Sequence, residues 1–154
     1  MDNLTQQAAV REYAGNSLDS PHGDFSRALV ELFLDVEWIV PLPRILEHQP
    51  GLASVRWAVF DHRSAVDHRY PRLPLAPHGE ELPYVFGLPF TDRANFTDEE
   101  RRLSDRAIRY WSNFAKSGDP NINPDLNTTG PSGNLTYWPE YGDTETYLLL
   151  RLNG

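Results

Sequence analysis

The feature that most constrains the fold is a capped amphipathic helix that begins after Thr97. The segment from Thr97 to Glu100 has the pattern of a capping box, in which the Thr97 side chain binds the amide of Glu100 and the Glu100 carboxylate reaches back. Lys116 and Gly118 predict the C-terminal end. The charged side of this helix indicates a solvated face rather than a binding patch. The apolar face comprises Leu103, Ala107, Ile108, Trp111, Phe114 and Ala115, and the opposite face comprises Arg101, Arg102, Asp105, Arg109 and Ser112.

The rest of the chain carries helical, strand and turn patterns in a definite order. Residues 24–40 show the clearest of the other helical patterns, with an apolar side that is expected to face the core. Pro41 and Pro43 are expected to stop or kink this helix. The predicted order is helix, strand, histidine turn, helix, strand. Helical periodicity covers residues 1–15, 24–40 and 44–49, strand patterns cover 54–60 and 147–152, and turn residues predict loops at 16–23 and 121–133.

Composition limits the class of protein. A chain of 154 residues with 40% apolar and 12% aromatic residues is long enough for one mostly globular domain. The formal net charge of -8, with only 14 scattered basic residues, disfavours nucleic acid and anionic membranes as partners. No stretch approaches the ~20 apolar residues of a membrane span.

Two adjacent Asp-His pairs, Asp61-His62 and Asp67-His68, superficially resemble metal ligands. Neighbouring residues cannot aim both side chains at one ion, and zinc sites need closely spaced sets with distant partners. A solvated loop is therefore the favoured interpretation, and we expect neither a metal nor a cofactor.

Four N-x-S/T triplets are present where nine asparagines and 17 Ser/Thr residues predict about one by chance. They predict glycosylation at Asn3, Asn95, Asn127 and Asn134 and passage through the secretory pathway, although a Thr/Asn-rich loop composition would explain the last two. The first residues show no basic start followed by an apolar run, so they are not a signal peptide. We therefore expect an upstream part of the protein to be missing from this chain, as in a gene-model fragment.

His78 lies in a turn bounded by proline and glycine. Ala76-Pro77 should be extended, and Gly79 lets the backbone turn sharply after the histidine. An imidazole with an ordinary pKa near ~6.5 can accept and return a proton at neutral pH, which is what a general base must do. A single loop histidine is also an ordinary surface residue, so this observation alone does not define an active site.

The order of several motifs resembles the C-terminal portion of type-B carboxylesterases, the family of cholinesterases, bile-salt-type lipases and neuroligins. Together the matching motifs span nearly the whole chain. They are Leu32-Phe33 through Pro41, Val59-Phe60-Asp61-His62-Arg63, His78-Gly79-Glu80-Glu81, Tyr84-Val85-Phe86-Gly87-Leu88-Pro89, Asn95-Phe96-Thr97, residues 110–121 and Trp138-Pro139.

The resemblance implies an α/β-hydrolase fold, with residues 1–154 forming a partial domain that holds the last strands and their covering helices. It also implies that His78 is the triad histidine and acts as general base. In that fold the serine and the acid precede the histidine, and we find neither G-x-S-x-G nor a Gly-rich oxyanion loop here. The isolated chain is therefore expected to be inactive. It is also expected to be poorly soluble or molten, because a few strands of a larger sheet leave edges and an apolar helix face uncovered. Glu80 and Glu81 follow the histidine too closely to orient it, so they are assigned local hydrogen bonds or entrance charge.

Two functions are compatible with the resemblance. One is a serine esterase acting on a small ester substrate. The other is a non-catalytic, neuroligin-like ectodomain that binds a cell-surface protein, a function suggested by residues 32–41, whereas residues 60–64 are more cholinesterase-like. Whether the protein is an enzyme depends on the upstream serine. Either function implies secretion or exposure on the cell surface, and a homodimer agrees with the resemblance without being fixed by the sequence.

Overall fold

The computed structural model describes residues 3–14, 25–47, 54–64, 76–126, 135–142 and 144–152. Contacts divide the chain into two compact units. The first unit comprises residues 1–52 and 72–77, and the second comprises residues 53–71 and 78–154. The histidine turn, the strands and the capped helix all belong to the second unit.

The first unit is helical. It contains α1 (Asn3–Ala14), α2 (Phe25–Leu34), a π-helical segment (Asp35–Ile39) and α3 (Pro41–Glu47). The predicted helix over residues 1–15 is confirmed, whereas the predicted loop at 16–23 lies outside the described residues. Tyr13 donates a hydrogen bond of 2.6 Å to Asp35 and so joins α1 to the π-helical segment.

The helical path of the first unit changes near Pro41, where the sequence predicts a stop or a kink: α2 ends at Leu34, the π-helical segment ends at Ile39 and a separate helix, α3, begins at Pro41. Pro41 is the first residue of α3, where a proline is tolerated because the amide it lacks would have no partner in the helix. The path reaches Pro41 through the π-helical turn, in which the Val40 amide donates to the Asp35 carbonyl at 2.9 Å. The regular α-helix therefore gives way to a π-helical segment before the proline, and a new helix begins at the proline itself.

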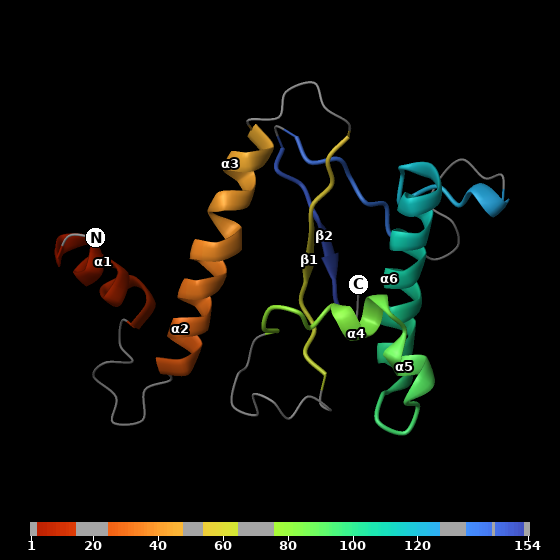
Figure 1. Cartoon of the computed structure of the whole chain (residues 1–154), viewed down its shortest axis with the longest axis horizontal. Coiled ribbons are helices and arrows are strands. Elements are labelled where there is room, and N and C mark those ends of the chain that lie inside the picture. The colour runs from red at the N-terminus through yellow and green to blue at the C-terminus, as the bar shows by residue number, and fades with distance from the viewer. Residues whose placement is uncertain are drawn as a thin grey trace. The chain divides into compact units, whose positions relative to one another are not determined.

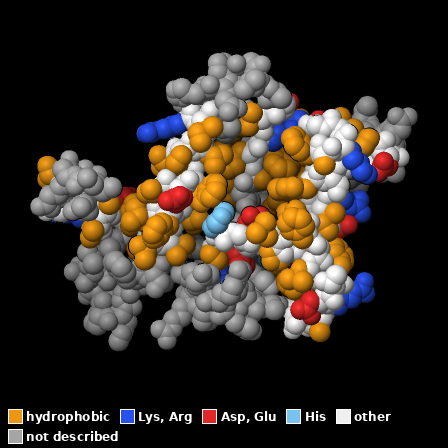
Figure 2. Space-filling model, in the orientation of Figure 1, with side chains coloured by type: hydrophobic (Ala, Val, Ile, Leu, Met, Phe, Trp, Pro, Cys, Tyr) orange, Lys and Arg blue, Asp and Glu red, His pale blue; other side chains and the backbone are white. Residues whose placement is uncertain are grey.

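The apolar side of this helical path is largely uncovered. Ala28 is buried, but Phe33 and Val36 are each 58% exposed. Figure 2 shows hydrophobic side chains gathered on the surface over these helices. The prediction of a core-facing helix is therefore wrong for most of this face, because the described helices of the first unit leave it exposed.

The second unit is built on a parallel pair of strands. β1 (Ala58–Phe60) pairs with β2 (Leu148–Leu150), with Ala58 opposite Leu148 and Phe60 opposite Leu150. Parallel strands need a long crossover, which helices usually supply. Here the crossover contains α4 (Leu82–Val85), α5 (Leu88–Thr91), α6 (Asp98–Ser117) and a 3₁₀ turn (Pro124–Leu126), and α4 lies beside the carboxyl ends of the strands (Figure 1).

The first predicted strand is shorter than the sequence pattern. Only its last three residues enter the ladder. Residues before Ala58 are still paired in part, because the Leu148 amide donates to Trp57 at 2.9 Å and the Tyr141 amide donates to Val55 at 2.8 Å. The apolar run near the C-terminus forms β2 as predicted.

The capped helix is confirmed at both ends. Thr97 accepts a hydrogen bond of 3.2 Å from the Glu100 amide, and its own amide donates to the Glu100 carboxylate at 2.8 Å. At the other end, Gly118 has the left-handed φ of 77° that glycine adopts without strain. Local capping chemistry therefore sets the length of α6.

The buried face of α6 is rotated from the predicted one. Trp111 is 39% exposed, Phe114 is 53% exposed and Ala115 is also exposed, although all three lie on the predicted apolar face. Polar residues replace them because they find partners inside: Ser104 donates to the Tyr84 carbonyl at 2.6 Å, and Asn113 donates to the Pro120 carbonyl at 3.0 Å. The core cluster comprises Tyr84, Phe96, Leu103, Ala107, Tyr110, Leu135, Trp138, Leu148 and Leu150.

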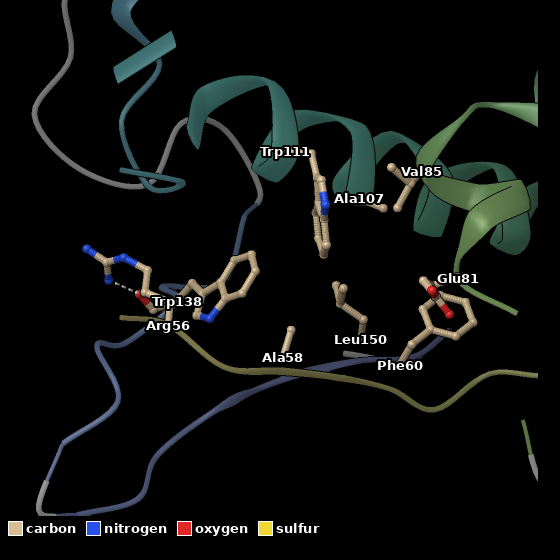
Figure 3. Close-up of a pocket in the computed structure, with 9 residues that line it drawn as sticks. All are labelled: Arg56, Ala58, Phe60, Glu81, Val85, Ala107, Trp111, Trp138 and Leu150. Atoms are coloured by element: carbon tan, nitrogen blue, oxygen red, sulfur yellow. Dashed lines mark hydrogen bonds between the residues drawn. The ribbon is translucent and has the colours of Figure 1, made fainter. Parts of the chain in front are cut away.

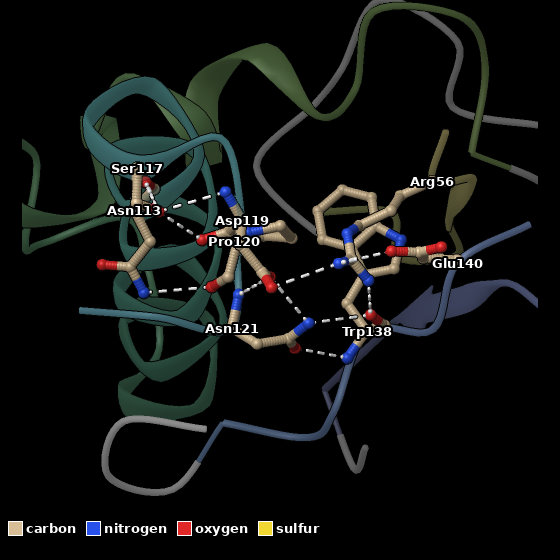
Figure 4. Close-up of polar contacts among 8 residues, drawn as sticks. All are labelled: Arg56, Asn113, Ser117, Asp119, Pro120, Asn121, Trp138 and Glu140. Carbon is tan, nitrogen blue, oxygen red and sulfur yellow. Dashed lines mark hydrogen bonds and ion pairs between the residues drawn. The ribbon is translucent and has the colours of Figure 1, made fainter. Parts of the chain in front are cut away.

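Polar side chains fasten the chain after α6 to the segment before β2 (Figure 4). Asn121 forms two hydrogen bonds with the backbone of Trp138, accepting from its amide at 2.7 Å and donating to its carbonyl at 2.9 Å. Arg56 donates to the same carbonyl at 2.6 Å and pairs with Asp119 at 3.3 Å. The Asp119-Pro120-Asn121 motif therefore has a structural role, which fixes the end of the crossover against the strand region.

Candidate functional site

His78 opens a turn that leads directly into α4. The turn spans residues 78–81, Gly79 has a left-handed φ of 89°, and the Leu82 amide donates to the Gly79 carbonyl at 3.2 Å. The His78 side chain is exposed. The structure thus places this imidazole where a group outside the described residues can reach it, and its role as general base stays a prediction.

The two glutamates after the histidine differ in their surroundings. Glu80 is buried, which excludes the entrance-charge interpretation for that residue. Its carboxylate contributes to raising the pKa of the Tyr84 phenol, so the two side chains are close in electrostatic terms. Glu81 is only partly buried, and its backbone carbonyl accepts from the Val85 amide at 2.9 Å in the first turn of α4.

Glu100 is the functional-site candidate that sequence reasoning missed, because the capping box explained it completely. The residue is only 3% exposed, and each of its carboxylate oxygens accepts two hydrogen bonds. One oxygen binds the Tyr84 hydroxyl at 3.0 Å and the His62 Nε2 at 3.1 Å. The other binds the Thr97 amide at 2.8 Å and the Thr97 hydroxyl at 3.1 Å.

Hydrogen bonding dominates the acidity of this carboxylate. Burial alone would raise the pKa of Glu100, but the bonds from the Thr97 backbone, His62, Ser64 and Tyr84 outweigh it and lower the pKa to about 2. The Tyr84 phenol responds in the opposite sense: burial raises its pKa, and the charge of Glu100 adds to this effect. At neutral pH the pair is therefore an ionised carboxylate and a neutral hydroxyl.

A sequence pattern could have revealed this cluster. Glu100 and Ser104 are four residues apart and lie on the same helical stripe as Leu103 and Ala107, so polar side chains in an apolar stripe indicate buried partners. The identity of those partners depends on the fold, since His62 is 38 residues away in the chain and Tyr84 is 16 residues away.

The Asp-His pairs predicted to be solvated have different outcomes. His62 is not a solvated loop residue, because Glu100 and the ring of Tyr84, whose centroid is 5.4 Å from that of the imidazole, enclose it. Asp67-His68 lies outside the described residues. Within the described ranges, no group of three or more His, Cys, Asp or Glu side chains is arranged to hold a metal ion.

A cavity of about 330 Å³ lies between α6 and the strands. Arg56 and Glu81 lie on its border, and its apolar walls include Phe60, Trp111 and Trp138 (Figure 3). His78 is not among the residues that line it. The histidine turn therefore reaches the cavity through Glu81, its last residue, whereas His78 itself does not line it.

The glycosylation candidates are only partly described. Asn95 is exposed in the turn before α6, where its side-chain amide donates to both carboxylate oxygens of Asp92 at 3.0 Å. Asn3 is the first residue of α1, and its side chain lies outside the description. Asn127 and Asn134 lie outside the described residues. Among the described helices, none has the length and hydropathy required to cross a bilayer.

Comparisons with known proteins agree with the motif order. The model of the carboxylesterase family matches residues 2–154. An acetylcholinesterase of Bungarus fasciatus is 41% identical over 141 residues, which cover 91% of this chain and 22% of that protein. Acetylcholinesterase 1 of Caenorhabditis briggsae is 35% identical over 140 residues, covering 90% of this chain and 22% of the relative.

A relative named for a different substrate matches about as well. Pyrethroid hydrolase Ces2e of Rattus norvegicus is 36% identical over 144 residues, covering 92% of this chain and 23% of its own length. The chain thus spans less than a quarter of each of these relatives. Similarity extends to both cholinesterases and carboxylesterases, so it does not select one substrate.

Proposed function

The chain belongs to the carboxylesterase family, and from that premise we propose that it supplies the histidine turn of a serine ester hydrolase. The family has the α/β-hydrolase fold, and the parallel β1–β2 pair with its helical crossover is consistent with a part of that fold. Ester hydrolysis is the activity of the family. The chain covers only 22% to 23% of the relatives it matches, so ester hydrolysis by the complete protein is proposed here rather than shown.

The observation that carries the proposal is the place of His78 in the fold. Ligands of open α/β sheets bind outside the carboxyl ends of the strands. Tyr84 of α4 lies at that end, since its ring centroid is 5.1 Å from that of Phe60, the last residue of β1. The exposed His78 precedes α4 by one short turn, so it is held close to the edge where this fold performs chemistry.

The proposed mechanism is acyl transfer. His78 accepts the proton of a serine hydroxyl as the serine oxygen attacks the ester carbonyl, and then donates that proton to the leaving alcohol. Water repeats the cycle to release the acid. The serine and the orienting acid come from another part of the complete protein, because no G-x-S-x-G motif precedes His78 in this sequence.

A second candidate is a non-catalytic adhesion ectodomain, with a cell-surface protein as its partner. The neuroligin-like sequence of residues 32–41 favours it, and Phe33 and Val36 within that segment are exposed apolar residues that a partner would cover. The His78 turn does not discriminate between the two functions. The residue at the nucleophile position of the complete protein does.

For either function we propose that the complete protein passes through the secretory pathway. The exposed position of Asn95 beside Thr97 makes that triplet accessible to glycosylation. Mass mapping of secreted material after glycosidase treatment tests this assignment. Unmodified asparagine at all four triplets would reject it.

The test of the catalytic proposal is His78→Ala in the complete protein, with hydrolysis of a chromogenic short-chain ester as the measurement. Loss of the general base should reduce kcat by about 10²- to 10⁴-fold or more while the fold is retained. Arg93→Ala, another exposed residue of the second unit, is the control and should keep full activity. Equal rates in wild type and His78→Ala would reject His78 as the base, whereas an inactive wild type that binds a cell-surface protein would favour the adhesion function.

A further inference from the structure

We propose that Glu100 is a positioning residue for the His78 turn, because its carboxylate ties α4 and the segment after β1 to the start of α6. The catalytic consequence of this inference rests on the proposed ester hydrolysis. The structural consequence, an ordered turn at residues 78–81, does not depend on it.

Helix α6 holds Tyr84 at both of its polar ends. The Tyr84 hydroxyl donates to the Glu100 carboxylate at 3.0 Å, and its backbone carbonyl accepts from the Ser104 hydroxyl at 2.6 Å. Glu100 and Ser104 are one helical turn apart, and Tyr84 is fully buried. The position of this residue along and across α6 is therefore fixed by two separate bonds.

Fixing Tyr84 also fixes the histidine turn. α4 has only four residues, and so short a helix is not stable by itself. Its order depends on tertiary contacts, of which those of Tyr84 are the most buried. Backbone bonds transmit that order toward the histidine: Val85 to Glu81 at 2.9 Å, and Leu82 to Gly79 at 3.2 Å.

Capping alone does not explain the second oxygen of Glu100. A capping box needs only the oxygen that binds Thr97, and a solvated glutamate can perform that role. The other oxygen is buried and accepts from Tyr84 and His62, which come from two different segments of the chain. Burying a carboxylate is costly unless hydrogen bonds satisfy it, so the paired donors indicate a role in joining these segments.

The test compares Glu100→Gln with Glu99→Gln in the complete protein. Glutamine has nearly the same shape as glutamate, but its NH₂ group replaces one carboxylate oxygen. That group is a donor, so it cannot accept the two hydrogen bonds that the replaced oxygen accepts. Glu99 is an exposed neighbour that pairs with Arg102 at 2.7 Å, so its substitution controls for loss of a charge at this helix end. The first readout is hydrogen exchange of the backbone amides of residues 79–86, and the second is the separation of kcat from KM for ester hydrolysis.

We expect Glu100→Gln to accelerate exchange at residues 79–86 by about tenfold, which corresponds to the loss of a buried hydrogen-bond acceptor. In an active protein kcat should fall about tenfold with KM nearly unchanged. Glu99→Gln should change neither. Unchanged exchange at residues 79–86 in a folded Glu100→Gln protein would overturn the inference.

Tyr84→Phe provides a second variant that retains the packed ring. It should accelerate hydrogen exchange of the same amides by about threefold. The control is Tyr110→Phe: Tyr110 is also buried, but it lies further along α6 and its hydroxyl donates to the Thr136 carbonyl, so its loss should leave exchange at residues 79–86 unchanged. If Glu100→Gln fails to fold, this pair decides the question: equal exchange in the two variants would overturn the inference. Absence of ester hydrolysis in wild type would reject the proposed function, while the exchange result would still decide the positioning role.

Discussion

The two units of this chain each present an apolar helical stripe, but the stripes differ in what covers them. In the second unit, Leu103 and Ala107 of α6 are completely buried. In the first unit, Phe33 and Val36 on the α2 path are more than half exposed. Helical periodicity therefore predicts the helix in both cases, whereas coverage depends on the topology of the chain around it.

The difference has a topological cause. The second unit is a strand–helix–strand crossover, so β1 and β2 lie beside each other and α6 packs on them. Segments distant in sequence thereby form one core. The first unit is a succession of helices, in which the bond from Tyr13 to Asp35 is one long-range polar contact. Neighbouring helices alone do not cover the apolar side of α2.

The largest effect is expected from truncating the covered stripe. Leu103→Ala should lower the free energy of unfolding by about 2–5 kcal/mol, because it removes a fully buried side chain and leaves a cavity. Phe114→Ala removes a larger but half-exposed side chain of the same helix and should cost much less. Hydrogen exchange of the α6 amides in the complete protein measures both. Similar costs in the two variants would show that the outer face of α6 is also covered there.

Acid should weaken the second unit through Glu100. The folded-state pKa of about 2 lies below the ordinary value of 4.5, so the ionised carboxylate favours folding at every pH above about 4.5. This contribution is lost as the pH falls from about 4.5 to about 2. Hydrogen exchange of α6 amides across that range measures the loss.

Glu100→Gln is the control for the acid effect, because it removes the titrating group. The slope of stability against pH below about 4.5 should be shallower in this variant than in wild type. An identical slope would assign the acid sensitivity to other carboxylates. The first unit, which lacks a described buried carboxylate of this kind, should respond less.

The sequence predicts features that depend on neighbouring residues. Three such features are the cap at Thr97, the helix end at Gly118 and the exposed turn of His78. Each is determined by a few residues within four positions of it. Both strands were also located, although β1 is shorter than its pattern. In each case local conformational preferences agree with the final structure.

Features that depend on distant partners were not predictable in the same way. The buried face of α6 is rotated because Ser104 and Asn113 find partners inside the unit. Glu100 joins segments that are far apart in the chain, and only the folded arrangement reveals which ones. The sequence predicted an interruption of the helix at Pro41 but not its form, because the π-helical turn before the proline has no evident sequence pattern.

A moderate effect is expected from the helix cap. Thr97→Ala removes the hydroxyl that accepts from the Glu100 amide and should cost about 0.5–2 kcal/mol. Exchange should accelerate at the first turn of α6 more than at residues 79–86, because the bond from Tyr84 to Glu100 is retained. Equal acceleration in both segments would mean that the cap and the histidine turn open as one unit.

The smallest effect on folding is expected on the uncovered stripe. Phe33→Ser in the chain of residues 1–154 should change the exchange of the α2 amides by the equivalent of no more than about 0.5 kcal/mol, because the ring is already 58% exposed. The same substitution should reduce self-association in light scattering, since exposed apolar patches promote it. Glu37→Gln, at an exposed polar position of the same path, is the control and should not reduce association. In the complete protein, a loss of about 2 kcal/mol or more in the free energy of unfolding for Phe33→Ser would show that another segment buries this face. The difference in coverage between the two apolar stripes would then be a property of residues 1–154 alone.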